Sequence, residues 1–373
     1  MSEYQYYEFR AIDRPLTEAQ KSKISALSSR ARVTPHMASF VYNYGDFRGN
    51  PEQLMRNYFD AMIYMNNWGS RRLMFRIPQS LIETKKVGRY CVSEEINAME
   101  TKEDVVLDLN FHDEELAEWT EGEGWLDELV EMREELIQGD FRVLYLAWLK
   151  AAKNALGAED IDDDTPEPPV PPGLNQLSDA LNVFVRFLGI EEAMLVVAAQ
   201  KSKEQKEDRL QLVNWVEKLP IEEQHGFLKR LSRGEPNLSI LLNRRLHELA
   251  NTTQGSKEGA FSGQRTIAGL IQTAEEWRRC KQEDERRKEE LARKRRLEEL
   301  ALKENEVWLQ VKALIEEKKP KSYDSAIGLL KDLRELAEYQ GRLEEFKKHI
   351  AEIQQTYSSR TALRDRMIHA RLI

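Results

Sequence analysis

Polar and apolar character alternate with a period of two from Tyr6 to Ala11, which predicts a strand with one face drier than the other. Alternating or extended runs recur at 39–44, 71–77, 90–96 and 105–111. Helical spacing and turn residues separate the first three runs, so the order over residues 1–112 is βαβαβββ. Right-handed crossovers would fold this order into a sheet with helices on one face. We therefore predict the α+β fold class, with an aromatic-rich N-terminal domain that is a small α/β sandwich of ferredoxin-like type.

Beyond residue 112 the apolar residues take helical spacing, so the rest of the chain is predicted to be all-α. The clearest example has apolar side chains at i, i+3, i+4 and i+7, namely Leu181, Phe184, Val185 and Leu188. Residues 113–173 are predicted as acidic helices followed by a Pro-rich spacer, because five of the chain's twelve prolines fall within 166–172. Residues 174–254 are predicted as a helical bundle.

Two further segments are set apart by composition. Gly, Ser and Thr predict a flexible linker over 255–270. Residues 271–318 are predicted to form a long charged helix. Of the 25 residues from Glu275 to Glu299, 19 are charged, and side chains of opposite charge recur at i to i+4 spacing. Apolar positions before Leu297 are too sparse for a sustained coiled-coil seam.

The last segment, 319–373, is predicted as a helical hairpin similar to a tetratricopeptide unit. A Tyr-Asp-x-Ala-x-x-Leu-Leu helix from Tyr323 is followed by a turn at Gly341 and a helix carrying Phe346. Four residues on the expected shared face are the candidate partner-binding residues: Leu329, Leu333, Phe346 and Ile350. The hairpin is therefore predicted to dock a protein partner or to cap the chain.

Nucleic-acid binding is the alternative function that the residues suggest. A sheet face carrying Tyr and Arg can stack unpaired bases, and the candidates for such a platform are Tyr4, Tyr6, Arg72 and Arg76. Ordinary core packing is the competing interpretation and the one we favour, because the third strand lacks the RNA-recognition signature. The basic run Arg293-Lys294-Arg295-Arg296 could contact phosphates, but neighbouring glutamates cancel most of its field.

Charge, cysteine content and missing motifs narrow the functional classes. The net charge of -9 is unevenly distributed, with -16 over residues 101–167 and small positive values at both ends, which disfavours a uniform nucleic-acid coat protein. The longest apolar runs have seven residues, too short for a membrane span, and the start lacks a secretory signal, so we expect a cytoplasmic protein. With only Cys91 and Cys280, no metal or other cofactor is predicted. No familiar catalytic motif is present, and no catalytic residue is proposed.

Two segments resemble a bacterial family. Tyr323–Leu372 resembles the helical C-terminal region of uncharacterised bacterial SWIM zinc-finger proteins. The segment Trp215–Leu249, which begins Trp-Val-Glu-Lys-Leu-Pro, resembles their middle region. The zinc finger itself, a Cys-x-Cys with a downstream Cys-x-His, is absent, so the metal and any finger-dependent DNA contact do not carry over. The resemblance implies helical architecture but no assigned activity.

The residues thus favour a non-enzymatic cytoplasmic adaptor or scaffold that docks a protein partner through its helical C-terminal region. The alternative is a nucleic-acid-associated factor in genome defence or RNA handling that uses the aromatic sheet and the basic run. An enzyme of unrecognised type is the third hypothesis.

Overall fold

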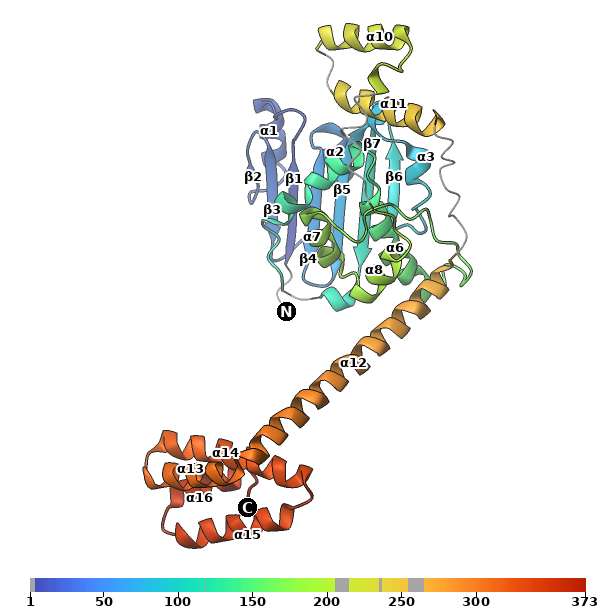
Figure 1. The fold of residues 1–373 in the computed structure, drawn as a ribbon. Coiled ribbons are helices and arrows are strands. Elements are labelled where there is room, and N and C mark those ends of the chain that lie inside the picture. The colour runs from blue at the N-terminus through green and yellow to red at the C-terminus, as the bar shows by residue number, and fades with distance from the viewer. Residues whose placement is uncertain (1–3, 118, 205–214, 235–236, 254–264) are drawn as a thin grey trace. The chain divides into compact units, whose positions relative to one another are not determined.

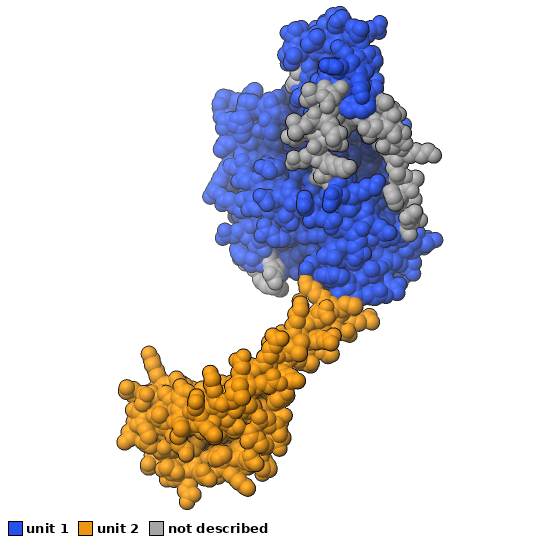
Figure 2. Space-filling view, viewed as in Figure 1, with its two compact units in different colours: residues 1–278 blue, residues 279–373 orange. Residues whose placement is uncertain are grey.

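The computed structural model describes residues 4–117, 119–204, 215–234, 237–253 and 265–373. The chain divides into two compact units, unit 1 (Met1–Arg278) and unit 2 (Arg279–Ile373), coloured separately in Figure 2. An antiparallel sheet near the N-terminus is followed by helices in the middle and at the C-terminus (Figure 1), which confirms the predicted α+β class.

Unit 1 is built around a sheet whose described strands follow the order β2-β3-β1-β4-β5-β7-β6. The strands are β1 (Gln5–Arg10), β2 (Arg32–Val33), β3 (Met37–Tyr42), β4 (Ala61–Asn66), β5 (Ser70–Pro78), β6 (Ile96–Glu100) and β7 (Asp104–His112). Every directly bonded pair is antiparallel. Because β3 and β4 both run antiparallel to β1, which lies between them, the connection through helix α2 (Pro51–Asn57) is a split crossover like those expected for a ferredoxin-like fold. The other neighbouring strands of the sheet, β2–β3, β4–β5, β5–β7 and β6–β7, also pair in antiparallel orientation.

The β4–β5 hairpin shows how local sequence sets this register. Gly69 adopts a φ of +98°, and a Cβ there would lie 2.0 Å from the carbonyl oxygen of Asp113. Asn66 Oδ1 accepts hydrogen bonds from the backbone N–H groups of Trp68 (3.2 Å) and Ser70 (2.7 Å). Only glycine satisfies both the positive φ and the close approach, so the turn is fixed at this point in the chain.

The two faces of the sheet belong to different cores. One face, which includes Ile63, Phe75 and Leu107, packs against the helices that follow the sheet in sequence. The opposite face, which includes Phe9 and Met62, packs against α1 (Glu18–Ser25) and α2. Helix α1 begins with a capping box in which Thr17 and Gln20 exchange hydrogen bonds. Helices therefore cover both faces of the sheet, and the prediction of helices on one face only was wrong.

The remaining described helices of unit 1 follow in chain order. They are η1 (Gln79–Leu81), α3 (Thr84–Val87), η2 (Glu114–Leu116), α4 (Trp125–Leu129), α5 (Glu131–Ile137), α6 (Arg142–Gly157), α7 (Asp179–Leu188), α8 (Glu192–Ala199), α10 (Ile221–Ser232), α11 (Leu238–Thr253) and the start of α12 (Ile267–Leu302). Helix α7 begins at an N-cap, Ser178, and ends at Gly189 with a φ of 62°. No helix among the described residues is long and apolar enough to cross a membrane.

The Pro-rich segment predicted as a spacer within 113–173 packs against the rest of unit 1. The carbonyl oxygens of Pro169 and Pro171 accept hydrogen bonds from the hydroxyls of Tyr90 (2.9 Å) and Ser202 (2.8 Å). Burial raises the pKa of Tyr90 to about 12. Prolines lack an N–H but keep their carbonyl acceptors, so these two prolines take part only as acceptors. Composition alone does not indicate these distant donors.

The predicted linker, 255–270, lies largely outside the described residues, and its described end is ordered. Arg265 donates to both carboxylate oxygens of Glu167 at 2.7 and 2.6 Å, and Glu167 is 4% exposed. Thr266 forms an isolated bridge with Pro166. Ile267 and Leu270, in the first turn of α12, are fully buried. Residues 265–278 therefore complete the core of unit 1.

Unit 2 is helical and consists of the rest of α12 followed by α13 (Glu304–Glu316), α14 (Pro320–Tyr339), α15 (Leu343–Thr356) and α16 (Thr361–His369). The single helix expected over 271–318 is interrupted at Lys303, which lies between α12 and α13. Every residue from Gln282 to Arg296 in α12 is exposed. Helix α14 contacts α13, α15 and α16, so the unit has more helices than the predicted hairpin.

Candidate partner-binding surfaces

The four residues predicted to bind a partner lie in the core of unit 2. Leu333, Phe346 and Ile350 are 2–4% exposed, and Leu329 is partly buried against them. Their spacing does create a shared face, but α13 and α16 fill that face with Val311 and other apolar side chains. A partner could reach these residues only if unit 2 opened, so they stabilise the unit and do not form its contact surface.

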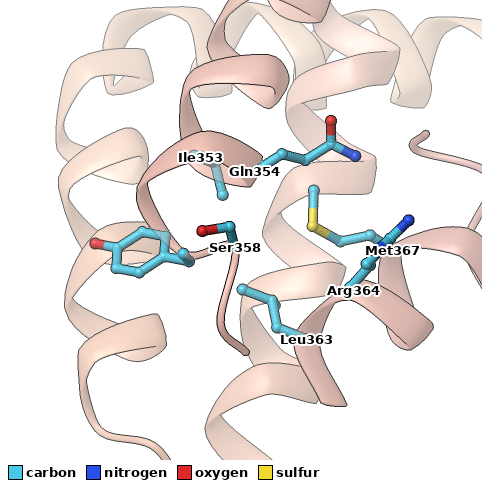
Figure 3. A pocket seen from close by; sticks show the side chains of 7 residues that line it. Ile353, Gln354, Ser358, Leu363, Arg364 and Met367 are labelled. Atoms are coloured by element: carbon cyan, nitrogen blue, oxygen red, sulfur yellow. The ribbon is translucent and has the colours of Figure 1, made fainter. Parts of the chain in front are cut away.

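A half-open groove lies between α15 and α16, at the surface of unit 2 (Figure 3). Its volume is about 190 Å³, smaller than the ~300–1,000 Å³ usual for small-molecule sites. The buried lining is apolar and the rim is polar. The apolar lining residues are Ile353, Leu363 and Met367, each 1–3% exposed, and the exposed rim residues are Gln354, Ser358 and Arg364. The apolar side chains thus form the floor of the groove, and the polar side chains form its accessible rim.

One wall of the groove is fixed by a charged neighbour. The guanidinium of Arg360 lies 4.5 Å from the centre of the Tyr357 ring, which lines the groove. Arg360 also donates to the backbone carbonyl of Ile315 and, at 2.9 Å, to Glu316. Burial, followed by the hydrogen bond and charge of Glu316, raises the pKa of Tyr357. Contacts within unit 2 thus hold this wall of the groove in place.

The basic run of α12 is engaged mainly within unit 2. Arg293 donates to Glu335 of α14 at 2.5 Å, and Arg296 forms ion pairs with Asp332 (3.4 Å) and Glu335. Lys294 lies 3.9 Å from Glu298, and Arg295 is exposed. The acidic residues of α14 therefore join the sequence neighbours in neutralising this run, so it does not form a concentrated phosphate-binding patch.

Tyr4 and Tyr6, proposed for base stacking, are 8% and 4% exposed. The Tyr4 hydroxyl accepts a hydrogen bond from the backbone N–H of Gly122 at 3.0 Å, and the Tyr6 hydroxyl donates to Glu8 at 2.6 Å. Burial, followed by the contact with Glu8, raises the pKa of Tyr6. Neither ring offers a free face, so these tyrosines pack as core residues.

Arg72 and Arg76 lie on the opposite face of the sheet from Tyr6. The register pairs Arg72 with Tyr64, and Tyr64 with Tyr7, so these side chains share one face while Tyr6 points the other way.

Both arginines have acidic partners on that face. Arg72 binds both carboxylate oxygens of Asp108, at 2.8 and 2.6 Å, and Arg76 lies 2.5 Å from Asp60 and 3.4 Å from Asp104. The proposed platform of Tyr4, Tyr6, Arg72 and Arg76 is therefore not assembled in the folded chain.

Sequence patterns missed an aromatic and polar cluster on the face that Arg72 does occupy. The rings of Tyr7 and Tyr64 stack with their centres 4.4 Å apart. Their hydroxyls donate to Oε1 of Gln5 at 3.2 and 3.4 Å. The alternating pattern places Tyr7 on one face of its strand, but the pattern does not show which strand lies beside it. The hydroxyls bond within the cluster, which is therefore best explained as packing.

Metal binding receives no support within the described part of the chain, where no group of three or more His, Cys, Asp or Glu side chains is placed to hold an ion. Burial raises the pKa of the partly buried Cys91 thiol, and Cys280 is exposed. A thiol with a raised pKa is a poorer nucleophile at neutral pH.

Comparison with known proteins finds no matching family model, no matching curated protein and no matching solved structure.

Proposed function

We propose that the protein is a cytoplasmic adaptor or scaffold that docks a protein partner through unit 2, with the groove between α15 and α16 as the contact site. The observation that carries this proposal is a groove of about 190 Å³, with an apolar floor and an exposed polar rim, on a helical unit that already has its own closed core. Interface hot spots typically consist of one anchoring side chain inserted in such a pocket, surrounded by a polar rim.

The charge and division of the chain also support an adaptor. Unit 1 and unit 2 have separate cores, and the shared helix α12 has an exposed, highly charged stretch from Gln282 to Arg296. A solvated segment of this kind is compatible with two binding modules in one chain. The resemblance to SWIM proteins remains a family hypothesis and adds no activity to the proposal.

The test uses two adjacent glutamines of α15. Gln354 lines the groove, whereas Gln355 is exposed and does not line it. The full chain would be used to select binders from a displayed peptide library, and the selected peptides would be titrated against Gln354→Trp and Gln355→Trp. An indole at position 354 obstructs the groove, so we expect at least about a tenfold loss of affinity there, a typical hot-spot effect. The variant at position 355 should bind like the unmodified chain.

Circular dichroism would confirm that both variants remain folded, which is expected because both positions are exposed. Equal affinity of the two variants, or failure to select any peptide with an apolar anchor, would remove the groove from the proposal.

A further inference from the structure

Strand β6 forms one edge of the sheet, and among the described strands it is bonded only to β7 (Figure 1). The opposite edge strand, β2, has two residues, whereas β6 has five. Of these five residues, Asn97 and Glu100 are exposed, and Ala98 and Met99 are partly exposed. An edge strand with unpaired backbone groups is a surface on which a further strand can pair.

The hydrogen-bond register determines which backbone groups of β6 face outward. The N–H of Asn110 donates to the carbonyl oxygen of Glu95 at 2.8 Å, and the N–H of Thr101 donates to that of Asp104 at 2.8 Å. In an antiparallel pair, hydrogen-bonded residues alternate with residues whose backbone groups point away from the partner strand. The odd-numbered residues of β6 therefore bond to β7, and the even-numbered residues point outward.

The outward groups of Ile96, Ala98 and Glu100 form a short row of donors and acceptors. The N–H of Ile96 is bonded to the carbonyl oxygen of Ser93 at 3.4 Å. Within the part of the chain that the structure describes, no hydrogen bond is found to the N–H groups of Ala98 and Glu100 or to the three carbonyl oxygens. An open hollow of about 590 Å³, lined in part by Ile96, lies at the start of this row. The row is thus available to a further strand.

We propose that β6 is a self-association edge, on which two copies of the chain pair their β6 strands in antiparallel orientation about a two-fold axis at Ala98. Each Ala98 N–H then donates to the Ala98 carbonyl oxygen of the other copy. Each Glu100 N–H donates to the Ile96 carbonyl oxygen of the other copy. The same edge serves on both copies, as in other two-fold dimers. This inference does not depend on the groove of unit 2.

The charges at the ends of β6 favour a second copy as the occupant and select this register. Glu94 precedes the strand, Lys102 follows it, and both are exposed. No ion pair to either side chain is found among the described residues. With the axis at Ala98, Lys102 of each copy lies opposite Glu94 of the other, and such cross-strand pairs of opposite charge are stabilising. A register displaced by two residues instead places Glu94 opposite an acidic residue, either Glu100 or Asp104.

The same register keeps like charges apart. Glu100 of one copy lies opposite Ile96 of the other, so the two Glu100 residues are four positions apart along the strands, or roughly 14 Å. That separation exceeds the Debye length of ~8–10 Å. A contact between two five-residue strands is smaller than the ~1,200 Å² of a stable interface. We therefore expect a reversible dimer with a Kd of about 10–100 µM.

The first experiment is sedimentation velocity of the full chain over about 1–300 µM, which brackets the expected Kd. The unmodified protein should pass from monomer to dimer. Ala98→Pro removes an outward N–H and no bond to β7, a position at which an edge strand tolerates proline, and it should raise the Kd at least tenfold. Ala98→Ser keeps the N–H, so this matched control should dimerise normally. Circular dichroism would establish that both variants are folded.

The second experiment exchanges the charges at the ends of the strand and leaves Ala98 unchanged. Glu94→Lys or Lys102→Glu alone places like charges opposite each other at both ends of the pair. Each should raise the Kd about fivefold at about 50 mM salt, and less at high salt. The double variant restores opposite charges at both ends, so its Kd should return to that of the unmodified protein. These variants test the pairing even where Ala98→Pro does not fold.

Three results would overturn the proposal: a monomer at every concentration, a Kd unchanged by Ala98→Pro in a folded chain, or single charge variants that the double variant does not rescue. A chain that stays monomeric but binds an extended peptide from a displayed library, with the binding lost in Ala98→Pro, would assign the edge to a different protein.

Discussion

Unit 1 buries charged side chains, whereas unit 2 keeps its charges at the surface. Among the described residues, the buried polar or charged side chains include Arg76, Arg133 and Lys150 of unit 1, but only Ser322 of unit 2. A buried charge requires a partner, and the partners in unit 1 come from distant parts of the sequence, as with Arg133 and Asp13, 120 residues apart. The core of unit 2 is formed by apolar side chains on consecutive helices. The two units therefore depend on different interactions for their stability.

The largest expected effect is on unit 1 and comes from Asp60→Ala. Asp60 is 1% exposed, binds Arg76 at 2.5 Å and accepts from the backbone N–H groups of Ile12 and Asp13 at 2.6 and 3.0 Å. Its removal leaves a buried guanidinium and two donors without their acceptor, so we expect a loss of about 4–5 kcal/mol in the free energy of unfolding of unit 1. Hydrogen exchange monitored by mass spectrometry should show lost protection in the sheet and unchanged protection in α13–α16. Lost protection in both units would contradict the independence of the cores.

The converse change in unit 2 is Phe346→Ala. Phe346 is 4% exposed and its ring centre lies 5.8 Å from that of Trp308. The cavity left behind should cost about 3 kcal/mol in the unfolding of unit 2. Denaturant titration followed by hydrogen exchange should detect this loss only in the helical unit. An unchanged unit 2, or a loss shared by the sheet, would show that the contacts of Phe346 do not stabilise one unit alone.

An intermediate effect is expected from Asp113→Asn, with a defined pH dependence. Burial acts to raise the pKa of Asp113, but the ammonium of Lys150 and the backbone N–H of Glu115 hold it below its ordinary value of 3.8. Because the pKa is lowered by folding, the stabilisation is fully present above about pH 4 and disappears as the pH falls through the folded-state pKa.

The Asn variant should therefore be about 2 kcal/mol less stable than the unmodified chain at pH 7, and this difference should shrink below pH 4. Denaturant unfolding at a series of pH values measures it. Glu344→Gln, which alters an exposed pair with Lys347, is the control and should show no comparable deficit. A deficit for Asp113→Asn that is independent of pH would mean that the ion pair is not its source.

The smallest effect is expected from Arg296→Ala in unit 2. Arg296 is 56% exposed and its partners Asp332 and Glu335 are 44% and 25% exposed, so solvent screens these pairs. We expect a loss of about 0.5 kcal/mol, which should decrease further in high salt. Thermal unfolding at two salt concentrations would measure this loss. A loss of stability as large as that of Asp60→Ala would contradict the view that the two units depend on different interactions.

The same contrast explains what could be predicted from the sequence. The apolar spacing around Leu333, Phe346 and Ile350 correctly indicated a shared buried face, because helical packing partners in unit 2 are near in sequence. The inference that this face binds a partner is contradicted by the structure, because α13 and α16 close over it.

In unit 1, alternation predicted strands but not which strands are neighbours. That information decides that Arg72 shares a face with Tyr64 and not with Tyr6. The groove of unit 2 was also missed, although Leu363 and Met367 stand at i and i+4, because a groove depends on the gap between two helices and not on either helix alone.

The anchoring of Arg265 to Glu167 has a consequence for dividing the protein. Residues 265–278 supply Ile267, Leu270 and Ala274 to the core of unit 1, although they follow a segment that composition marks as a boundary. A polypeptide ending before Arg265 would expose the cavity that these side chains fill. A second polypeptide beginning at Arg265 would carry the missing piece at its N-terminus. The two should recognise each other as complementing fragments and rebuild unit 1 without a peptide bond between them.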